Sequence, residues 1–430
     1  MSRPYFAAAI IAVISSISNQ LRAEAPSPCV TITRENLIGC AMSGSLAVRR
    51  DRYGTQAAEG RVQSTRPLFP ANPVLSGSLA RREGRGSEPT ATNWSATLAQ
   101  EVEIAGQRGA RRDAAENEKV AQVNRTLMTE RETGALAWTT YFDVIALREE
   151  LRLAERIQKL GTQVAVAARA RADRGVLSTV DADLAEAAQT RLAQERSAID
   201  RRFRSAATNL ITLVGGDPMV ITADTGVRID GDLTALRSAE VASRESAVNF
   251  ESRPDVAAFR AEQRAEEARA SVFRRARVPN ITVSVFAQND GYNERVLGVG
   301  LGVPIPIPGI GRTYAGEIAE AEALEQRAST EADRLKRDAR RELANAVYAY
   351  VSRRTELEAF PRDRLERAER SLSDIAKEIE GGRVGVRDAL LAQQTLIELL
   401  RSHIEVRRAL CLASVDLSRA ANVALERGDQ

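Results

Sequence analysis

The chain has 430 residues, of which 61 are basic and 58 acidic, so its formal net charge is only +3. A balance this even excludes a protein that neutralises a nucleic-acid backbone, because such a protein carries a surplus of basic charge on one face. Aromatic residues make up only 4% of the chain, and alanine, glutamate, arginine and leucine fill long stretches of it. That composition is typical of long helices and disfavours a compact α/β enzyme.

The first 25 residues have the pattern of a secretory signal peptide. Arg3 provides a short basic start, and residues 5–18 form an apolar stretch that is shorter than the ~20 residues of a membrane-spanning helix. Small residues then permit cleavage after Ala23 or after Ala25. We therefore expect residues 1–25 to direct export. No later stretch reaches ~18 apolar residues, so a membrane role for the mature chain would require β-strands.

The three cysteines are Cys29, Cys40 and Cys411. In an oxidising compartment Cys29 and Cys40 could pair. Residues 37–40 also look like a lipid-attachment site, although the charged and polar residues 33–36 stand where such a signal has an apolar run. The sequence leaves both alternatives open, a disulfide between Cys29 and Cys40 or a lipid on Cys40.

Two similar units follow one another along the chain. A strand-like run, a glycine turn and an Ala/Glu-rich helix occur at Gly106 and again 203 residues later at Gly309. A second glycine precedes a helix at Gly175 and, 207 residues later, at Gly382. An apolar seam with identical spacing follows both: Leu184, Leu192, Ile199, Phe203 and Leu210 correspond to Leu391, Leu399, Val406, Leu410 and Leu417. We infer a duplication, with one extra helical turn in the second copy marked by Pro361.

The duplication predicts the organisation of the chain. Residues 26–217 form the first repeat, with a helix, a β-hairpin at 72–104 and a helical hairpin made of helices 108–174 and 176–213. Residues 218–250 form a linker or equatorial segment. Residues 251–424 form the second repeat, with a helix at 254–276, a β-hairpin at 281–303 and a second helical hairpin, and 425–430 form a tail.

Four short strands are expected, at 72–82, 94–104, 281–288 and 296–303. In the third, Ile281, Val283 and Val285 alternate with Thr282, Ser284 and Phe286. Period-two alternation over ~8–11 residues is typical of a tilted membrane strand, and Trp94 fits an interfacial aromatic belt. Because small membrane barrels have ~8 strands or more, four strands require association in a symmetric ring. The alternative is a small soluble sheet at the end of a coiled coil.

In this order, the segments resemble the TolC-like outer-membrane efflux family. The resemblance covers nearly all of the mature chain, and its most specific parts are RPDVAAFRAE from Arg253, VPIPIPGIGR from Val303 and GGRVGVRDALLAQQ from Gly381. The run EVEIAGQRGARR from Glu101 is more similar to the metal-cation (CzcC-like) branch than to the drug branch.

The resemblance implies a mainly α fold with a small membrane β part. Long helical hairpins would form a periplasmic tunnel, and three chains would complete a 12-stranded barrel in the outer membrane of a Gram-negative bacterium. The homotrimer would work with a periplasmic adaptor and an inner-membrane pump of the RND type, in contact with outer-membrane lipid, to export small solutes, metal cations among them. The competing hypothesis is a periplasmic coiled-coil adaptor or scaffold without a pore.

The resemblance also assigns candidate site residues. The hairpin tips, where the adaptor would dock, fall on Gly175, Val176, Leu177, Gly382, Arg383 and Val384. Asp388 matches a carboxylate that narrows the tunnel and selects cations, and Asp181 is its counterpart in the first repeat. Leu391 stands where a second aspartate is often found. Three copies of one aspartate around an axis would concentrate negative potential, whereas the simpler reading of Asp388 is a favourable charge at a helix N-terminus.

No catalytic or metal-binding chemistry is predicted. The only histidine, His403, corresponds to Arg196 in the first repeat, so we expect it on a polar helix face and not as a ligand. No Cys/His cluster has the spacing of metal ligands, and no Ser or Cys nucleophile has a base nearby in the sequence pattern. We therefore expect neither an enzyme nor a cofactor.

Overall fold

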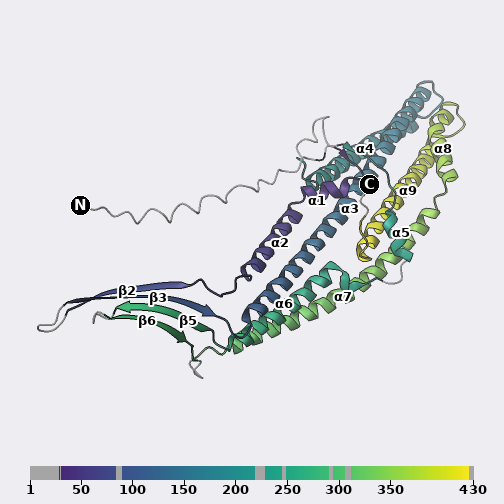
Figure 1. Ribbon diagram of the computed structural model, residues 1–430. Coiled ribbons are helices and arrows are strands. Elements are labelled where there is room, and N and C mark those ends of the chain that lie inside the picture. The colour runs from purple at the N-terminus through teal and green to yellow at the C-terminus, as the bar shows by residue number, and fades with distance from the viewer. Residues whose placement is uncertain are drawn as a thin grey trace, which may run out of the picture.

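The computed structural model describes residues 29, 31–83, 90–217, 228–244, 248–289, 294–305 and 311–425. The predicted signal peptide, the end of the predicted tail (426–430), residues 218–227 and 245–247 of the predicted linker, and the turn containing Gly309 lie outside the described residues. The molecule is elongated, with a β-sheet at one end and the turns of two helical hairpins at the other (Figure 1).

Helices account for most of the fold. Their bounds are α1 Leu37–Gly44, α2 Leu46–Ser64, α3 Gln107–Asp173, α4 Thr179–Leu213, α5 Arg237–Arg244, α6 Pro254–Ala276, α7 Ala315–Glu358, α8 Arg362–Glu380 and α9 Val386–Ala420, with a 3-10 turn at Phe250–Ser252. Because α3 contains no proline, nothing interrupts its 67 residues, which span about 100 Å. Within the described residues, no helix has both the length and the apolar character needed to cross a membrane.

The main core lies midway along the molecule, around an aromatic cluster on α3. Trp138, Tyr141 and Phe142 are fully buried, and their spacing of three and four residues puts them on one face of the helix. The Trp138 and Phe142 rings stack with centroids 5.3 Å apart, and Tyr141 meets Trp138 edge-on at 5.6 Å. This cluster fixes α3 as the element against which α1, α4, α8 and α9 pack.

Both long helices begin at a residue in the left-handed conformation. Gly106 precedes α3 with φ 73°, and Tyr314 precedes α7 with φ 56°. Gly106 and Tyr314 lie almost equally far from their tip glycines, 69 residues before Gly175 and 68 residues before Gly382. The second repeat therefore has no extra helical turn between the start of α7 and its tip glycine, so that prediction is wrong. The residues that lengthen the second repeat lie before Tyr314. Pro361 does break the helix, as the residue that precedes α8.

The sheet combines both predicted hairpins. Its strands are β2 Val74–Arg82, β3 Ala91–Val102, β5 Ile281–Asn289 and β6 Arg295–Gly302, all antiparallel in the order β2-β3-β5-β6. The predicted bounds were within two or three residues, since β3 begins at Ala91 instead of Trp94. The sequence did not predict the β3–β5 pairing, which joins the two repeats into one sheet.

The two faces of the sheet differ sharply. One row that crosses all four strands consists of Leu75, Leu98, Val285 and Val299, each paired with the next. The neighbouring row, on the opposite face, consists of Ser76, Thr97, Phe286 and Gly298. The apolar face is open, with Leu297 and Val299 both 81% exposed. The predicted alternation of apolar residues with small or polar residues is thus present in three dimensions.

A second, smaller sheet lies near the middle of the molecule. The strands β1 (Thr31–Ile32) and β4 (Arg228–Ile229) pair in parallel, so the start of the described chain meets the predicted linker. The linker is anchored to α3 where Tyr141 donates a hydrogen bond to the Asp230 carbonyl (2.9 Å), and to α9 where the Leu236 amide donates to Ser414 (2.9 Å).

A buried amide connects the sheet to the helices. Gln107, at the start of α3, is 3% exposed, and its Oε1 accepts a hydrogen bond from the Ala105 amide at 3.0 Å. Its Nε2 donates to the Val278 carbonyl (3.2 Å) and to Asn280 Oδ1 (3.1 Å), just before β5. One side chain thus fixes the junctions of both repeats.

We expect Gln107→Leu to destabilise this junction by about 1–3 kcal/mol, because it leaves buried partners without hydrogen bonds. Hydrogen exchange should become faster in residues 101–110 and 275–282. The matched control is Gln194→Leu, which replaces an exposed amide on α4. Equal exchange in the two variants would contradict the junction role.

Candidate functional site

The two helical hairpins end in the same turn. After α3, the Gly175 amide donates to the Ala172 carbonyl (2.9 Å) and the Val176 amide to the Arg171 carbonyl (3.0 Å). After α8, Gly382 and Arg383 repeat the pattern, donating to Ile379 and Glu378, both at 3.0 Å. These are Schellman motifs, which require a left-handed residue, and both glycines have φ 73°. The predicted tip residues therefore do lie in the turns, at the end of the molecule away from the sheet (Figure 1).

The helices that leave the tips are equally long but begin differently. Both α4 and α9 have 35 residues, with Asp181 and Asp388 in their first turns. The Ser178 hydroxyl accepts a hydrogen bond from the Val180 amide at the start of α4, whereas Gly385 leaves α9 without a side-chain cap. A carboxylate in the first turn is favourable in both helices because the helix N-terminus carries partial positive charge.

The two predicted gate residues have different surroundings. Asp181 is half-buried and forms an ion pair with Arg387, the neighbour of Asp388, at 3.2 Å. Asp388 is exposed, and no ion pair with it is found in the described part of the chain. The structure thus brings both carboxylates to one end of the molecule, and it leaves Asp388 the more available of the two for solute.

A second contact ties the hairpins together near their tips. Arg171, on α3, donates a hydrogen bond to the Ile379 carbonyl in the last turn of α8. The guanidinium also lies 3.1 Å from the position that a Cβ on Gly382 would occupy. A side chain at position 382 would therefore meet both backbone strain and Arg171. Among the described residues, the Arg171 hydrogen bond and the Asp181–Arg387 ion pair both join the two tips.

We expect Arg171→Ala to loosen the second tip, because a hydrogen bond from a charged donor contributes about 1.5–3 kcal/mol. Amide exchange in residues 376–385 should become faster. The double variant Arg171→Ala, Arg387→Ala should exchange faster still, but by a smaller step, because exposed ion pairs contribute only ~0–1 kcal/mol. Arg174→Ala is the control, because within the described residues that guanidinium bonds only its own helix, at the Ala170 carbonyl. Exchange that is equally fast in the control would argue against the tie.

The apolar seam of the sequence is buried only in part. Ile199, Leu210, Leu410 and Leu417 are buried, as the spacing predicted. The first position of each seam is not, because Leu184 is 42% exposed and Leu391 67% exposed. Leu391 follows Asp388 by three residues, so both side chains lie on the same exposed face of α9.

The second hairpin carries an open groove beside its tip. The groove measures about 590 Å³ and lies between α8 and α9. Its lining alternates charge with apolar surface: Arg367, Arg370, Ser371, Asp374, Ile375, Glu378, Val384, Ala389 and Ala392. Val384 is one of the predicted tip residues, whereas nothing in the sequence pointed to the α8 residues of this lining.

The first hairpin also carries charged side chains near its tip. The Arg169 guanidinium donates to Glu186 (2.7 Å) and to Asp183 (2.7 Å), linking α3 to α4 across the polar surface. The hydrogen bond from Arg169 holds the pKa of the Glu186 carboxyl below its usual value. Glu186 therefore remains charged at neutral pH.

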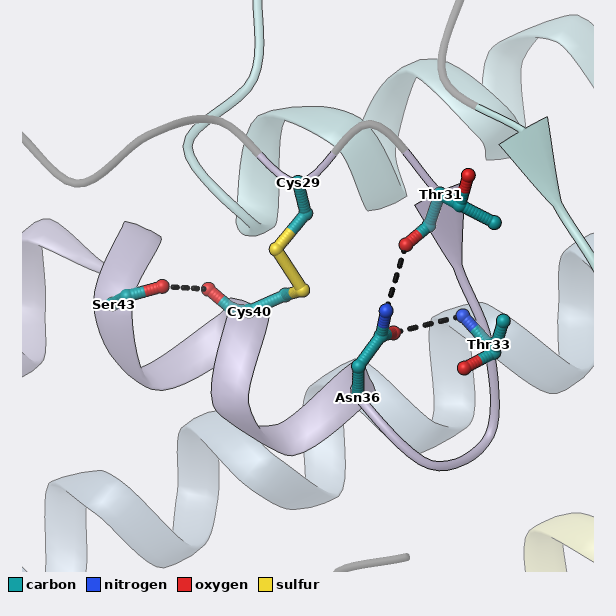
Figure 2. Close-up of a disulfide and its surroundings, with 6 residues drawn as sticks. All are labelled: Cys29, Thr31, Thr33, Asn36, Cys40 and Ser43. Carbon is teal, nitrogen blue, oxygen red and sulfur yellow. Dashed lines mark hydrogen bonds between the residues drawn. A yellow bond between two sulfur atoms is a disulfide. The ribbon is translucent and has the colours of Figure 1, made fainter.

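The cysteines and the histidine lie nearer the centre. Cys29 and Cys40 form a disulfide (Figure 2). Cys411 is buried, and burial raises the pKa of its thiol to about 12, so it is not a reactive thiolate at neutral pH. His403 is half-buried beside the Phe360 ring, at 5.7 Å between centroids, so it is less solvated than predicted, and burial lowers its pKa.

Known proteins resemble this chain in sequence. Residues 38–216 and 250–423 match the outer membrane efflux protein family. The cobalt-zinc-cadmium resistance protein CzcC of Cupriavidus metallidurans is 26% identical over 371 residues, which cover 85% of this chain and 84% of that protein. The pyoverdine export outer membrane protein OpmQ of Pseudomonas putida is 28% identical over 267 residues, or 57% of this chain and 55% of that protein.

Solved structures share the fold. The outer membrane protein VceC of Vibrio cholerae has a TM-score of 0.72 at 17% identity, covering 91% of this chain and 97% of that one. The CmeC outer membrane channel of Campylobacter jejuni has a TM-score of 0.74 at 14% identity, covering 92% of this chain and 87% of that one. Since the family match runs through both repeats and the fold agrees over nearly the whole chain, the protein belongs to the outer membrane efflux protein family.

Proposed function

We propose that this protein is one of three identical subunits of an outer-membrane efflux channel that extends into the periplasm. The observation that carries the proposal is the four-stranded sheet at the end of the long helical hairpins. Its outward face is apolar, with Leu75, Leu98, Val285 and Val299 in one exposed row, while the other face carries mainly small and polar side chains, with Phe286 among them. Such a sheet is suited to hydrocarbon on one side and water on the other.

The edges of the sheet favour a ring of subunits. β2 and β6 each have one neighbour among the described strands, so each leaves a row of backbone donors and acceptors unpaired. In hydrocarbon, unpaired backbone groups cost several kcal/mol each, and closure is the only way to satisfy them. Pairing β2 of one chain with β6 of the next gives a closed barrel, and three chains of four strands give twelve.

The helical tips would then lie at the periplasmic end. We propose that they dock a periplasmic adaptor and, through it, an inner-membrane pump of the RND type. The turns at Gly175 and Gly382 present Val176, Leu177, Arg383 and Val384, and the groove between α8 and α9 offers an adjoining apolar and charged surface. A partner helix with complementary charge would fit such a groove.

Asp388 is the proposed selectivity residue of the periplasmic gate. Its carboxylate is exposed at the start of α9, and three copies near the symmetry axis would raise the local concentration of cations. The similarity to CzcC, whose name refers to cobalt, zinc and cadmium resistance, extends over most of this chain and favours metal cations as cargo. Asp181 is the weaker candidate because Arg387 neutralises it.

The competing hypothesis, a periplasmic adaptor or scaffold without a pore, is disfavoured. The family match covers both repeats, and an adaptor would have no use for a sheet with a wide exposed apolar face. A channel requires no catalytic step, and we propose none for this chain.

Two measurements test the channel. Purified protein in detergent should have the mass of three chains, and it should produce discrete conductance steps in a planar lipid bilayer. A monomer that fractionates with soluble periplasmic proteins and leaves the bilayer silent would overturn the proposal.

A further inference from the structure

Cys29 and residues 31–45 form an N-terminal clasp over the middle of the molecule. Its strand β1 pairs with β4 of the linker, Thr31 with Arg228 and Ile32 with Ile229, and the Asp230 amide donates to the Ile32 carbonyl at 2.9 Å. The Ile32 side chain is completely buried in the main core. The clasp is therefore part of the folded body and not a loose leader.

Arg34 adds further contacts between the clasp and the linker. Its guanidinium donates to the Thr234 carbonyl (2.7 Å) and the Ala235 carbonyl (3.2 Å), and it lies 5.4 Å from the centre of the Trp138 ring. Because this stretch of linker also bonds α9, through Leu236 and Ser414, the clasp helps to hold the linker between the two long hairpins.

The disulfide closes the loop that contains these contacts. Cys29 and Cys40 are 11 positions apart, and β1, Arg34 and Asn36 all lie between them. Asn36 braces the loop from within, donating to the Thr31 carbonyl and accepting from the Thr33 amide, both at 2.8 Å (Figure 2). Cys40 itself lies in α1 and is only 4% exposed.

We infer that the chain matures by thiol–disulfide exchange with a protein disulfide donor in the periplasm, and that this bond, not a lipid on Cys40, secures the N-terminal segment. One thiolate attacks the donor disulfide to give a mixed disulfide, and the second thiolate then displaces the donor sulfur. Two S–H bonds and the donor S–S bond are lost, the Cys29–Cys40 bond forms, and the donor leaves as a dithiol with both electrons and both protons.

The lipid alternative conflicts with the packing. A lipid on Cys40 needs a thioether at the sulfur atom that the disulfide occupies, and the chain would be cleaved directly before Cys40. Cleavage there would remove Ile32 from the core, Arg34 from Trp138 and β1 from β4. An acyl chain would also have to emerge from a nearly buried position. Cleavage upstream of Cys29 preserves every one of these contacts.

The first test uses the native protein isolated from outer membranes. We expect a mature chain that begins before Cys29 and carries no acyl mass. After denaturation, an alkylating reagent should add one group, on Cys411, without reductant and three groups after reduction. A chain that begins at Cys40 with an acyl mass, or three groups added without reductant, would overturn the inference.

The second test measures whether the Cys29–Cys40 disulfide holds the clasp against the linker. In the Cys29→Ser, Cys40→Ser double variant, amide exchange should become about tenfold to a hundredfold faster in residues 31–45 and 228–236, while residues 164–185 at the tip stay unchanged. Ser43→Ala, which removes one hydroxyl from the clasp and keeps the bond, is the matched control. Unchanged exchange in the double variant would show that the bond does not hold the clasp. If that variant fails to assemble, the mass measurement on the native chain still decides between disulfide and lipid.

Discussion

Val299→Arg should abolish assembly of the protein in the outer membrane. Val299 is 81% exposed on the edge strand β6, where it ends the apolar row that crosses the sheet, directly opposite Val285 on β5. An arginine facing hydrocarbon near the bilayer midplane costs about 2–4 kcal/mol in a membrane barrel, and a trimer would carry three of them. The expected result is loss of the trimer band from outer-membrane fractions on unheated gels, together with accumulation of unassembled chain.

The control for this change is Ser284→Arg. Ser284 lies one residue from Val285 on β5, so its side chain points to the opposite, small and polar face, where it neighbours Gly300. An arginine there would extend toward water, and the trimer should form nearly as well as in the unaltered protein. Equal loss of trimer in both variants would mean that the apolar face does not meet lipid.

The sequence predicted those parts of the fold that follow from local sequence patterns. The alternation in β5 and β6 predicted strands within two residues, because each residue's face depends only on its place in the pleat. The turns at Gly175 and Gly382 were predicted because a glycine precedes a helix in both repeats, and the structure gives the reason, since the left-handed turn that ends a helix favours glycine. Tyr314, which adopts the same conformation without being glycine, gave no such signal, and the start of α7 was misaligned with Gly309 as a result.

What could not be predicted depends on contacts between distant residues. β1 and β4 have two residues each, too few for any periodicity, and they meet only because α3 and α9 bring the linker against the clasp. The β3–β5 pairing likewise depends on both repeats being folded. At the tips, the two aspartates look equivalent in the sequence, and only the structure distinguishes the one that Arg387 neutralises.

That distinction leads to a prediction about ion selectivity. Asp388→Asn removes a charge at the start of α9 without changing the size of the side chain. If three Asp388 carboxylates surround the axis, the potential of a few kT that they create disappears, and the cation-to-anion permeability ratio should fall by roughly threefold to tenfold. Asp181→Asn removes a charge that Arg387 already balances, so the ratio should change much less.

Salt dependence separates this electrostatic effect from a change in pore width. The Debye length is about 10 Å at 0.1 M salt and about 3 Å at 1 M, so the difference between Asp388→Asn and the unaltered channel should be large in dilute salt and small in concentrated salt. A widened pore would raise conductance by a similar factor in both. Bilayer recordings of reversal potential and conductance at the two salt concentrations give both quantities. Selectivity that is unchanged in dilute salt would remove Asp388 from the gate and leave the exposed Leu391 face of α9 as the next constriction to test.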